Sequence, residues 1–575
     1  MKLIGLAVSE GVAIGPVYRY KPFDCAVSRR QLEAGETEAA AARYHSARRR
    51  ARLELEALHG RLAAEHPEKA AIFAAHLDIL FDAAMEEEIL ACIAHERVAE
   101  DWAVDRVYAQ YAALLSEADD ALISERAADI VDVKIRLLRC LAGEEDAGFA
   151  ALTTPSVILA HDLLPSDTAS LDRALTLGII TEVGGATSHS AIIARGFGIP
   201  AVLGVQRALE HIEPQSTVIL DAVDGAVLLS PTPQEIADYT EKREAFRKKS
   251  AQLERYLRAQ PLTRDGVHVE VDLNIGGVGD AELAGADFTD GVGLFRTEFL
   301  FMGRSRLPDE EEQRAAYTRV LDVYGDRPVI FRTLDAGGDK KLDALSLPVE
   351  ENPFLGNRAQ RLCLSRPDIF HTQLRACLRA GAGKVLWLMF PMVGSLEDIR
   401  AAKEAVRLAE TELKAQGLPH CENVKLGIMV EIPSIALMAA EAACEVDFAS
   451  IGTNDLTQYL LAVDRMNPAV TAYYQMFHPA VFRLIKRVAD AFIAQGKPVG
   501  VCGELGGNKL AIPALIGFGI RKLSMGASSV AAAKQIVCGL TLPQAQEIAQ
   551  TVCATATAAE TEAYLQRESS RLTET

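Results

Sequence analysis

The sequence predicts a multidomain α/β protein whose C-terminal half folds as a (β/α)8 barrel. The chain has 575 residues, which is too long for a single hydrophobic core. Residues from about 30 to 145 are rich in Ala, Leu, Glu and Arg and show helical periodicity. After Pro261, apolar strand-like runs alternate with helical segments, and eight such units over about 300 residues are typical of this barrel.

Eight short apolar runs are the expected barrel strands. They are "VHVEVDLN", "GVGLFR", "PVIFRTLD", "VLWLMFPM", "KLGIMVE", "FASIGTND", "PVGVCGE" and "KLSMG". In (β/α)8 barrels, the chemistry collects at the carboxyl ends of the strands. Polar residues fall at those ends in this chain, namely Arg296, Arg332, Glu431, Asn454, Asp455 and Cys502.

The N-terminal half is expected to hold a small α/β domain with a helical bundle inserted into it. Short β-like runs lie between residues 150 and 230, and the opening run "KLIGLAVSEGVAIGPVYRY" looks like further strands of that domain. A charged amphipathic stretch over residues 232–260 suits a linker helix. The expected boundaries are 1–25 with 146–230 for the α/β domain, 26–145 for the bundle, 231–260 for the linker and 261–575 for the barrel.

Composition and net charge indicate the cellular compartment of the protein and the classes of molecule that it can bind. The net charge of −19 argues against nucleic acid as the main partner and permits a basic protein. No apolar run approaches the roughly 20 residues that span a bilayer, so we expect no direct membrane insertion. Ten cysteines without a CxxC pair indicate reduced thiols and therefore a cytoplasmic location. An acidic bundle face is either an ordinary solvated surface or a dock for a basic protein, and its residues are Glu68, Asp78, Asp82, Glu86, Glu87 and Glu88.

The stretch "GGATSHSAIIARG", residues 184–196, reads as a glycine-led loop that enters a helix. Either Thr187 or Ser188 would be the N-cap, and His189 would then lie in the first helical turn. This position favours negative charge. The pattern alone leaves three roles open for His189: packing, metal binding or carrying a phosphoryl group.

The strand-end residues of the barrel suggest a cation and an anion bound together. Glu431 and Asp455 suit Mg²⁺ or another hard cation, although each could instead pair with a neighbouring arginine. A group of basic residues would be costly to bring together unless a phosphate or carboxylate ligand neutralised it, and its members are Arg296, Arg332, Arg358, Arg465 and Lys340. Cys502 is either a small buried hydrophobe or, with a perturbed pKa, a group that moves a proton.

Seven segments taken together resemble Enzyme I, the phosphoenolpyruvate–protein phosphotransferase family of the bacterial sugar phosphotransferase system. They are "GGATSHSAIIARGFGIPAVLG", "GVGLFRTEFLFM", "FRTLDAGGDK", "ENPFLGNRAQR", "MVEIPS", "SIGTNDLTQYLLAVDR" and "VCGEL". The match runs over nearly the whole chain. The sequence departs from the family pattern at Asn357, Met466 and Gly506.

The resemblance implies a function for each part. His189 would accept the phosphoryl group of phosphoenolpyruvate, helped by Thr187 and Ser188, and pass it to the phosphocarrier protein HPr docked on the bundle. Mg²⁺ would lie on Glu431 and Asp455, and Cys502 would protonate the departing enolate. The family also implies a homodimer held by the barrel. The substrate-binding residues would be Arg296, Arg332, Arg358, Asn454, Arg465 and Lys340.

Two other classes of protein share parts of this pattern. Pyruvate, phosphate dikinase and phosphoenolpyruvate synthase have the histidine domain and the barrel, but they need an ATP-binding domain for which this chain has no spare region. A non-catalytic relative that only binds phosphoenolpyruvate or a partner is disfavoured because the reactive residues His189, Glu431, Asp455 and Cys502 are all present.

Overall fold

The computed structural model divides the chain into two compact units, Met1–Ser250 and Ala251–Thr575. Each unit is described by itself below. The structure describes all residues except 21–26, 34, 64–66, 117–120, 145–148, 150–151, 165–166, 168–170, 186–187, 189, 192–193, 196–197, 303, 305, 339–341, 343, 346–347, 349 and 574–575.

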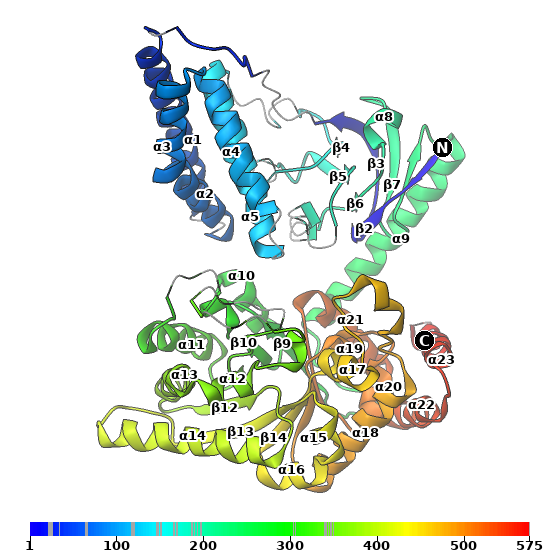
Figure 1. Cartoon of the computed structure of the whole chain (residues 1–575). Helices are drawn as coiled ribbons and strands as arrows, with labels where there is room; N and C mark the ends of the chain where they lie inside the picture. The colour runs from blue at the N-terminus through cyan, green and yellow to red at the C-terminus, as the bar shows by residue number, and fades with distance from the viewer. Residues whose placement is uncertain are drawn as a thin grey trace. The chain divides into compact units, whose positions relative to one another are not determined.

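The first unit contains an eight-stranded sheet with the order β1-β8-β7-β3-β4-β5-β6-β2 (Figure 1). Its strands are β1 (Lys2–Ile4), β2 (Leu6–Ser9), β3 (Val12–Arg19), β4 (Ser156–Ala160), β5 (Thr176–Thr181), β6 (Ala201–Leu203), β7 (Thr217–Asp221) and β8 (Ala226–Leu229). Strands β3, β4, β5 and β6 run parallel to their neighbours among themselves, and the remaining pairs are antiparallel. Because β3 pairs directly with β4, the intervening helices are an insertion between two neighbouring strands.

The inserted segment is a helical bundle, as its composition predicts. Its helices are α1 (Thr37–Ala63), α2 (Pro67–Leu80), α3 (Ala83–Ala91), the π-helical turn η1 (Cys92–Glu96), α4 (Glu100–Ser116) and α5 (Ala121–Ala142). One apolar core holds them together, with Tyr44, Leu55 and Val104 among its fully buried members. The ends of the sheet unit carry the short helix α8 (Ala208–His211) and the long charged helix α9 (Pro233–Leu257).

The second unit is a closed barrel of eight parallel strands. They are β9 (Glu270–Ile275), β10 (Val292–Arg296), β11 (Val329–Arg332), β12 (Val385–Phe390), β13 (Asn423–Val430), β14 (Phe448–Ile451), β15 (Val499–Val501) and β16 (Lys522–Met525). Each strand pairs with the next in sequence, and β16 closes on β9. All eight expected strand segments are therefore strands, and the predicted fold class is confirmed.

Helices surround the barrel strands (Figure 1). They are α10 (Asp280–Leu283), η2 (Ala284–Asp287), η3 (Glu298–Leu300), α11 (Glu310–Tyr324), η4 (Pro353–Leu355), α12 (Gln360–Ser365), α13 (Pro367–Ala380), α14 (Leu396–Ala415), α15 (Pro433–Leu437), α16 (Ala439–Glu445), α17 (Thr453–Leu461), η5 (Pro468–Tyr473), α18 (Pro479–Ala494), α19 (Glu504–Gly507), α20 (Ile512–Gly517), α21 (Ala527–Gly539), α22 (Leu542–Ala554) and α23 (Ala558–Thr573). One large core joins strands to helices, and a smaller cluster that includes Met389, Phe448 and Cys502 fills the barrel interior.

The end of helix α9 is fixed to the barrel unit by one buried lysine. The ammonium of Lys534 donates to the carbonyl of Leu257, the last residue of α9, to that of Ala259 just after it, and to the carbonyl of Phe288. The exact domain boundaries expected from the sequence stay predictions. Within the described part of the chain, no helix has the length and apolar character needed to cross a membrane.

At Gly517, helix α20 packs closely against helix α22. A Cβ at this position would lie 2.0 Å from the backbone oxygen of Ala545 in α22, whereas a Cβ on Gly526 would meet nothing within 4 Å. The substitution Gly517→Ala is expected to lower barrel stability by about 1–2 kcal/mol, because α22 must shift to admit the methyl group. The measurement is the calorimetric unfolding midpoint, with Gly526→Ala as the matched control. Equal midpoints for the two variants would contradict this packing.

Candidate active site

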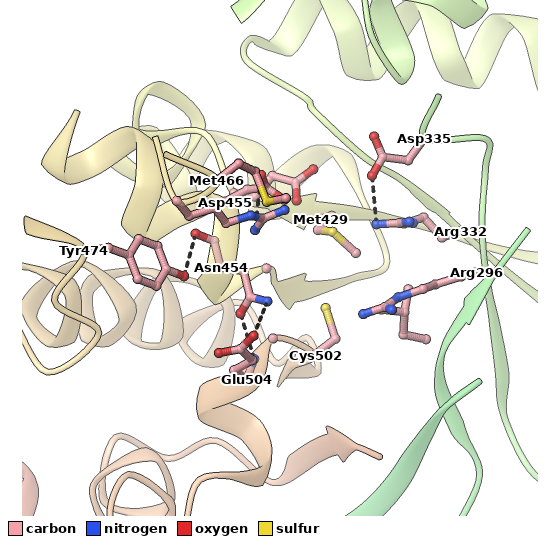
Figure 2. A pocket seen from close by; sticks show the side chains of 15 residues that line it. Arg296, Arg332, Asp335, Met429, Asn454, Asp455, Met466, Tyr474, Cys502 and Glu504 are labelled. Carbon is pink, nitrogen blue, oxygen red and sulfur yellow. Dashed lines mark hydrogen bonds and ion pairs between the residues drawn. The ribbon is translucent and has the colours of Figure 1, made fainter. Parts of the chain in front are cut away.

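The strand-end residues expected from the sequence lie together at one mouth of the barrel. Arg296 and Arg332 end β10 and β11, Glu431 follows β13, and Cys502 follows β15. Figure 2 shows Arg296, Arg332 and Cys502 around a common space. The cavity has a volume of about 480 Å³, which suits a small molecule. Its described lining consists of Leu294, Arg296, Arg332, Asp335, Met429, Glu431, Gly452, Asn454, Asp455, Arg465, Met466, Tyr474, Cys502, Gly503 and Glu504.

Acidic and basic side chains alternate along one wall of the site. The guanidinium of Arg332 lies 2.7 Å from Glu298 and 3.1 Å from Asp335. Asp335 also forms an ion pair with Arg358 at 2.9 Å. Arg358 and Arg465 each lie 3.6 Å from Asp455. We call this series, Glu298–Arg332–Asp335–Arg358–Asp455–Arg465, the ion-pair chain.

The ion-pair chain changes the expected charge balance of the site. The sequence suggests that a bound anion neutralises the arginines, but Glu298 and Asp335 already offset much of the charge on Arg332 and Arg358. Asp455 does pair with arginines, as the alternative interpretation allowed. Among the described residues, Arg296 has no carboxylate partner and is the most exposed arginine of the set. Arg296 is therefore the cation that most needs an anionic ligand.

The structure places some expected residues away from the cavity surface. Arg358 is only 1% exposed and lies behind the described lining, where Asp335 and Asp455 hold it. Lys340 lies outside the described residues, and so do His189 and Thr187. Their roles stay predictions. Two departures from the family pattern occupy the mouth region: Met466 lines the cavity and is 61% exposed, whereas Gly506 is buried against strand ends.

Glu431 and Asp455 form an acidic pair that fits a divalent cation. Glu431 is 1% exposed, and burial raises the pKa of its carboxyl to about 8, with further contributions from Asp455 and Asp335. One oxygen of Glu431 accepts from the Met392 backbone N–H at 2.6 Å. One buried oxygen of Asp455 has no hydrogen-bond partner among the described residues, and the same oxygen faces Arg358 and Arg465 at 3.6 Å. A cation bound by the two carboxylates would favour ionised Glu431.

The described residues offer no cluster of three or more carboxylate, imidazole or thiol groups around this pair. At phosphate sites, Mg²⁺ commonly binds two protein carboxylates, and substrate and water supply its remaining oxygen ligands. A glycine leaves room for it: a Cβ on Gly452 would lie 2.8 Å from a carboxylate oxygen of Glu431.

The amide of Asn454 is held in one orientation. Its oxygen accepts from the backbone N–H of Glu504 at 2.8 Å, and its nitrogen faces the Glu504 carboxylate at 3.4 Å. The hydroxyl of Tyr474 donates to the Asn454 backbone oxygen at 3.2 Å (Figure 2). Gly503 permits this close approach, because a Cβ there would lie 2.0 Å from the Thr453 hydroxyl.

Cys502 has the properties of a neutral proton donor. Its sulfur lies in the barrel interior and points toward the same space as the guanidinium of Arg296 (Figure 2). Burial raises the pKa of the Cys502 thiol to about 11. The group is therefore a thiol and not a thiolate near neutral pH, which is the state that can give a proton to a basic carbon.

The loop before His189 shows the expected helix start. Ser188 accepts from the backbone N–H of Ala191 at 3.3 Å and donates to the Gly185 carbonyl at 3.0 Å. Ser190 and Ala191 are helical. Ser188 thus makes the hydrogen bond of an N-cap, which agrees with one of the two caps expected from the sequence.

The acidic face of the bundle is smaller than the sequence suggests. Asp82 caps helix α3 by accepting from Met85, and Glu86 pairs with Arg48 at 2.6 Å. Glu88 accepts from Tyr111. Within the described residues, Asp78 and Glu87 remain exposed without an ion pair. The side chain of Glu68 lies outside the described ones.

Sequence reasoning missed four polar residues of the site: Glu298, Asp335, Tyr474 and Glu504. The first two follow β10 and β11 by only two or three residues, so the strand-end rule could have found them. Glu504 follows β15 by three residues, so the same rule could have found it as well. Tyr474 carries no such signal, because it reaches the cavity only through the folding of the chain after α17.

Comparison with known proteins covers almost the whole chain. Family models match the N-terminal region of PEP-utilising enzymes at residues 4–126, their mobile domain at 152–225 and their PEP-binding domain at 250–541. The chain is 43% identical to a phosphoenolpyruvate-protein phosphotransferase of Bacillus sp. (strain S), over 98% of this chain and 97% of the relative. It is 44% identical to the protein of that name from Geobacillus stearothermophilus, over 98% and 97%, and 41% identical to the one from Staphylococcus carnosus (strain TM300), over 97% of each.

The raised pKa of Cys502 predicts slow alkylation at neutral pH. In cation-free protein, iodoacetamide should modify exposed Cys444 at pH 7.5 far faster than buried Cys502. Because the thiolate is the reactive form and the pKa is about 11, the Cys502 rate should rise about tenfold per pH unit through pH 9.5. Site-resolved mass spectrometry measures both rates. A Cys502 rate that levels off below pH 9 would contradict the assignment.

Proposed function

The chain belongs to the family of phosphoenolpyruvate-protein phosphotransferases, and we propose that it moves the phosphoryl group of phosphoenolpyruvate first to its own His189 and then to the phosphocarrier protein HPr. The observation that carries this proposal is the barrel-mouth cavity, in which free Arg296 and the Glu431–Asp455 pair surround the neutral thiol of Cys502. Such a site suits a small substrate with a phosphate, a carboxylate and a carbon that must be protonated.

Each of the barrel residues would have its own role in binding phosphoenolpyruvate. Arg296 and Arg332 would receive the anionic groups of phosphoenolpyruvate, and Arg465 would approach from the opposite side of the cavity, beside Asp455. Asn454, fixed by Glu504 and Tyr474, would orient the phosphate. Arg358 would hold Asp335 and Asp455 in place, and Lys340 would add a further positive charge. Mg²⁺ held by Glu431 and Asp455 would neutralise negative charge on the substrate.

The chemical step balances with the groups present. The imidazole nitrogen of His189 attacks phosphorus, so that an N–P bond forms while the P–O bond to the enol oxygen breaks. The electron pair passes to the enolate, whose charge the arginines stabilise. The Cys502 thiol then gives its proton to the methylene carbon, which yields pyruvate. At the start of a helix, backbone N–H groups and the N-cap Ser188, with Thr187, would stabilise the phosphoryl group on His189.

We further propose that His189 moves between two stations in a homodimer held by the barrel. His189 lies within the segment matched by the mobile-domain model, residues 152–225. One imidazole must meet phosphoenolpyruvate at the barrel and later a bulky protein partner on the bundle, and a single rigid arrangement cannot serve both. Residues 231–260 are the hinge region of this proposal. Since Lys534 anchors the end of α9, the hinge would lie ahead of Leu257.

The labelling of His189→Ala tests the proposed function. The variant should bind phosphoenolpyruvate at the barrel yet take up no acid-labile phosphate from ³²P-labelled phosphoenolpyruvate, because the acceptor nitrogen is absent. The wild-type chain should be labelled and should pass the label to HPr. Labelled ATP serves as the control donor and should label neither protein. Full labelling of His189→Ala, or labelling by ATP, would overturn the proposal.

The acidic bundle face should be the HPr dock. The double variant Asp78→Lys with Glu87→Lys reverses two exposed, unpaired charges without removing the Asp82 cap or the Glu86–Arg48 pair. Its transfer to HPr should slow about tenfold at low salt, and the deficit should shrink as salt is added. Self-phosphorylation should stay unchanged. An equal loss in both half-reactions would place the dock elsewhere.

A further inference from the structure

Two aromatic residues hold the arginines at one end of the ion-pair chain. The ring of Phe354 faces the guanidinium groups of both Arg358, at 5.6 Å, and Arg465, at 5.9 Å. The hydroxyl of Tyr459 donates to the Phe354 carbonyl at 2.6 Å and lies 3.3 Å from a guanidinium nitrogen of Arg358. Phe354 belongs to η4, between β11 and α12, whereas Tyr459 lies on α17, so the contact joins segments about 100 residues apart in sequence.

Phe354 and Tyr459 are only partly buried. A second cavity of about 370 Å³ is lined by both of them and by neither arginine. Leu355, next to Phe354, is 64% exposed. A hydrogen bond to the Phe354 carbonyl fixes the backbone from which the ring projects, and so limits where the ring can lie. The Tyr459–Phe354 hydrogen bond supplies that restraint.

Tyr459 also reaches the acidic pair through one further residue. Its hydroxyl oxygen lies 3.7 Å from the sulfur of Met392, whose backbone N–H donates to Glu431 at 2.6 Å. On the other side of α17, Gln458 accepts from the backbone N–H of Arg465 at 3.1 Å. Gln458 and Tyr459, on the same turn of α17, therefore contact Arg465 and Met392 respectively.

We propose that Phe354 and Tyr459 are positioning residues that orient Arg465 for an anionic phosphate group, partly by fixing Arg358, which holds Asp455. Neither aromatic residue lines the described part of the reaction cavity, so they act through the two arginines, of which only Arg465 reaches the cavity. The proposal rests on the proposed function only for the identity of the site, because phosphate can bind beside Arg465 whether or not its transfer follows. A cation over a ring face and a hydrogen bond to a charged group both favour one guanidinium orientation.

The first test measures the affinity for inorganic phosphate by calorimetry, in the full chain and without turnover. Tyr459→Phe removes only the hydroxyl and should weaken phosphate binding about fivefold to tenfold. Tyr473→Phe is the matched control, since Tyr473 is 69% exposed and removal of its hydroxyl should change the affinity less than twofold. The turnover number with phosphoenolpyruvate should fall in Tyr459→Phe by a similar factor, with an unchanged unfolding midpoint.

A double-mutant cycle separates positioning from a general structural effect. Phe354→Leu and Arg465→Lys should be strongly non-additive in phosphate affinity, because each removes the same ring-to-guanidinium contact. Phe354→Leu and Arg296→Lys should be additive, since no described contact joins these residues. Arg465 suits this cycle better than buried Arg358, because its side chain is 21% exposed and tolerates substitution.

Two results would overturn the positioning role: Tyr459→Phe binding phosphate as tightly as Tyr473→Phe, or a cycle with Arg465 that is as additive as the cycle with Arg296. Failure of the proposed function is distinguishable from both. In that case the wild-type chain would take no label from phosphoenolpyruvate, while the phosphate affinities of the variants would still decide whether the aromatic pair positions the arginines.

Discussion

The buried alternation of carboxylates and guanidinium groups at the barrel mouth is the constraint on which the site depends. Several arginines cannot share a desolvated cavity unless acids offset their charge. Glu298 and Asp335 do this for Arg332 and Arg358, and in doing so they fix the guanidinium orientations before any ligand arrives. Arg296 has no such partner in the described part of the chain. The site therefore combines preformed geometry with one unmet positive charge, which is the combination that electrostatic preorganisation requires.

The barrel topology makes this alternation possible. Parallel strands place their carboxyl ends at one rim, so Arg296 of β10 and Glu431 after β13 line one cavity although more than 100 positions separate them in sequence. The helix after β14 adds Asn454 and Asp455 in its first turn, and glycines at 452 and 503 let its backbone approach the neighbouring groups. His189, the proposed phosphoryl acceptor, belongs to the other unit. In this proposal, substrate binding and phosphoryl acceptance fall to different parts of the chain.

Sequence reasoning succeeded where local pattern and global fold agree. The apolar runs of the barrel are short and bounded by polar residues, so each strand and its functional end could be located together. It failed where a residue's role depends on a distant neighbour. The sequence could not show that Glu86 of the acidic bundle face meets Arg48 from another helix, or that Asp82 caps α3. Arg358 looked like a mouth residue, yet the fold buries it behind the cavity wall. Phe354 and Tyr459 read as ordinary loop and helix residues, because their partners are the arginines of other segments.

The sequence by itself determined the eight-stranded barrel, the sheet domain with its helical insertion, the family and the polar residues that end the strands. These follow from hydrophobic periodicity and from motifs, which are properties of contiguous residues. Only the tertiary structure decided which carboxylate meets which arginine, which charges stay unpaired and how the buried Cys502 thiol is kept neutral. Those properties depend on distance and on exclusion of water, and both arise when segments far apart in the chain are brought together.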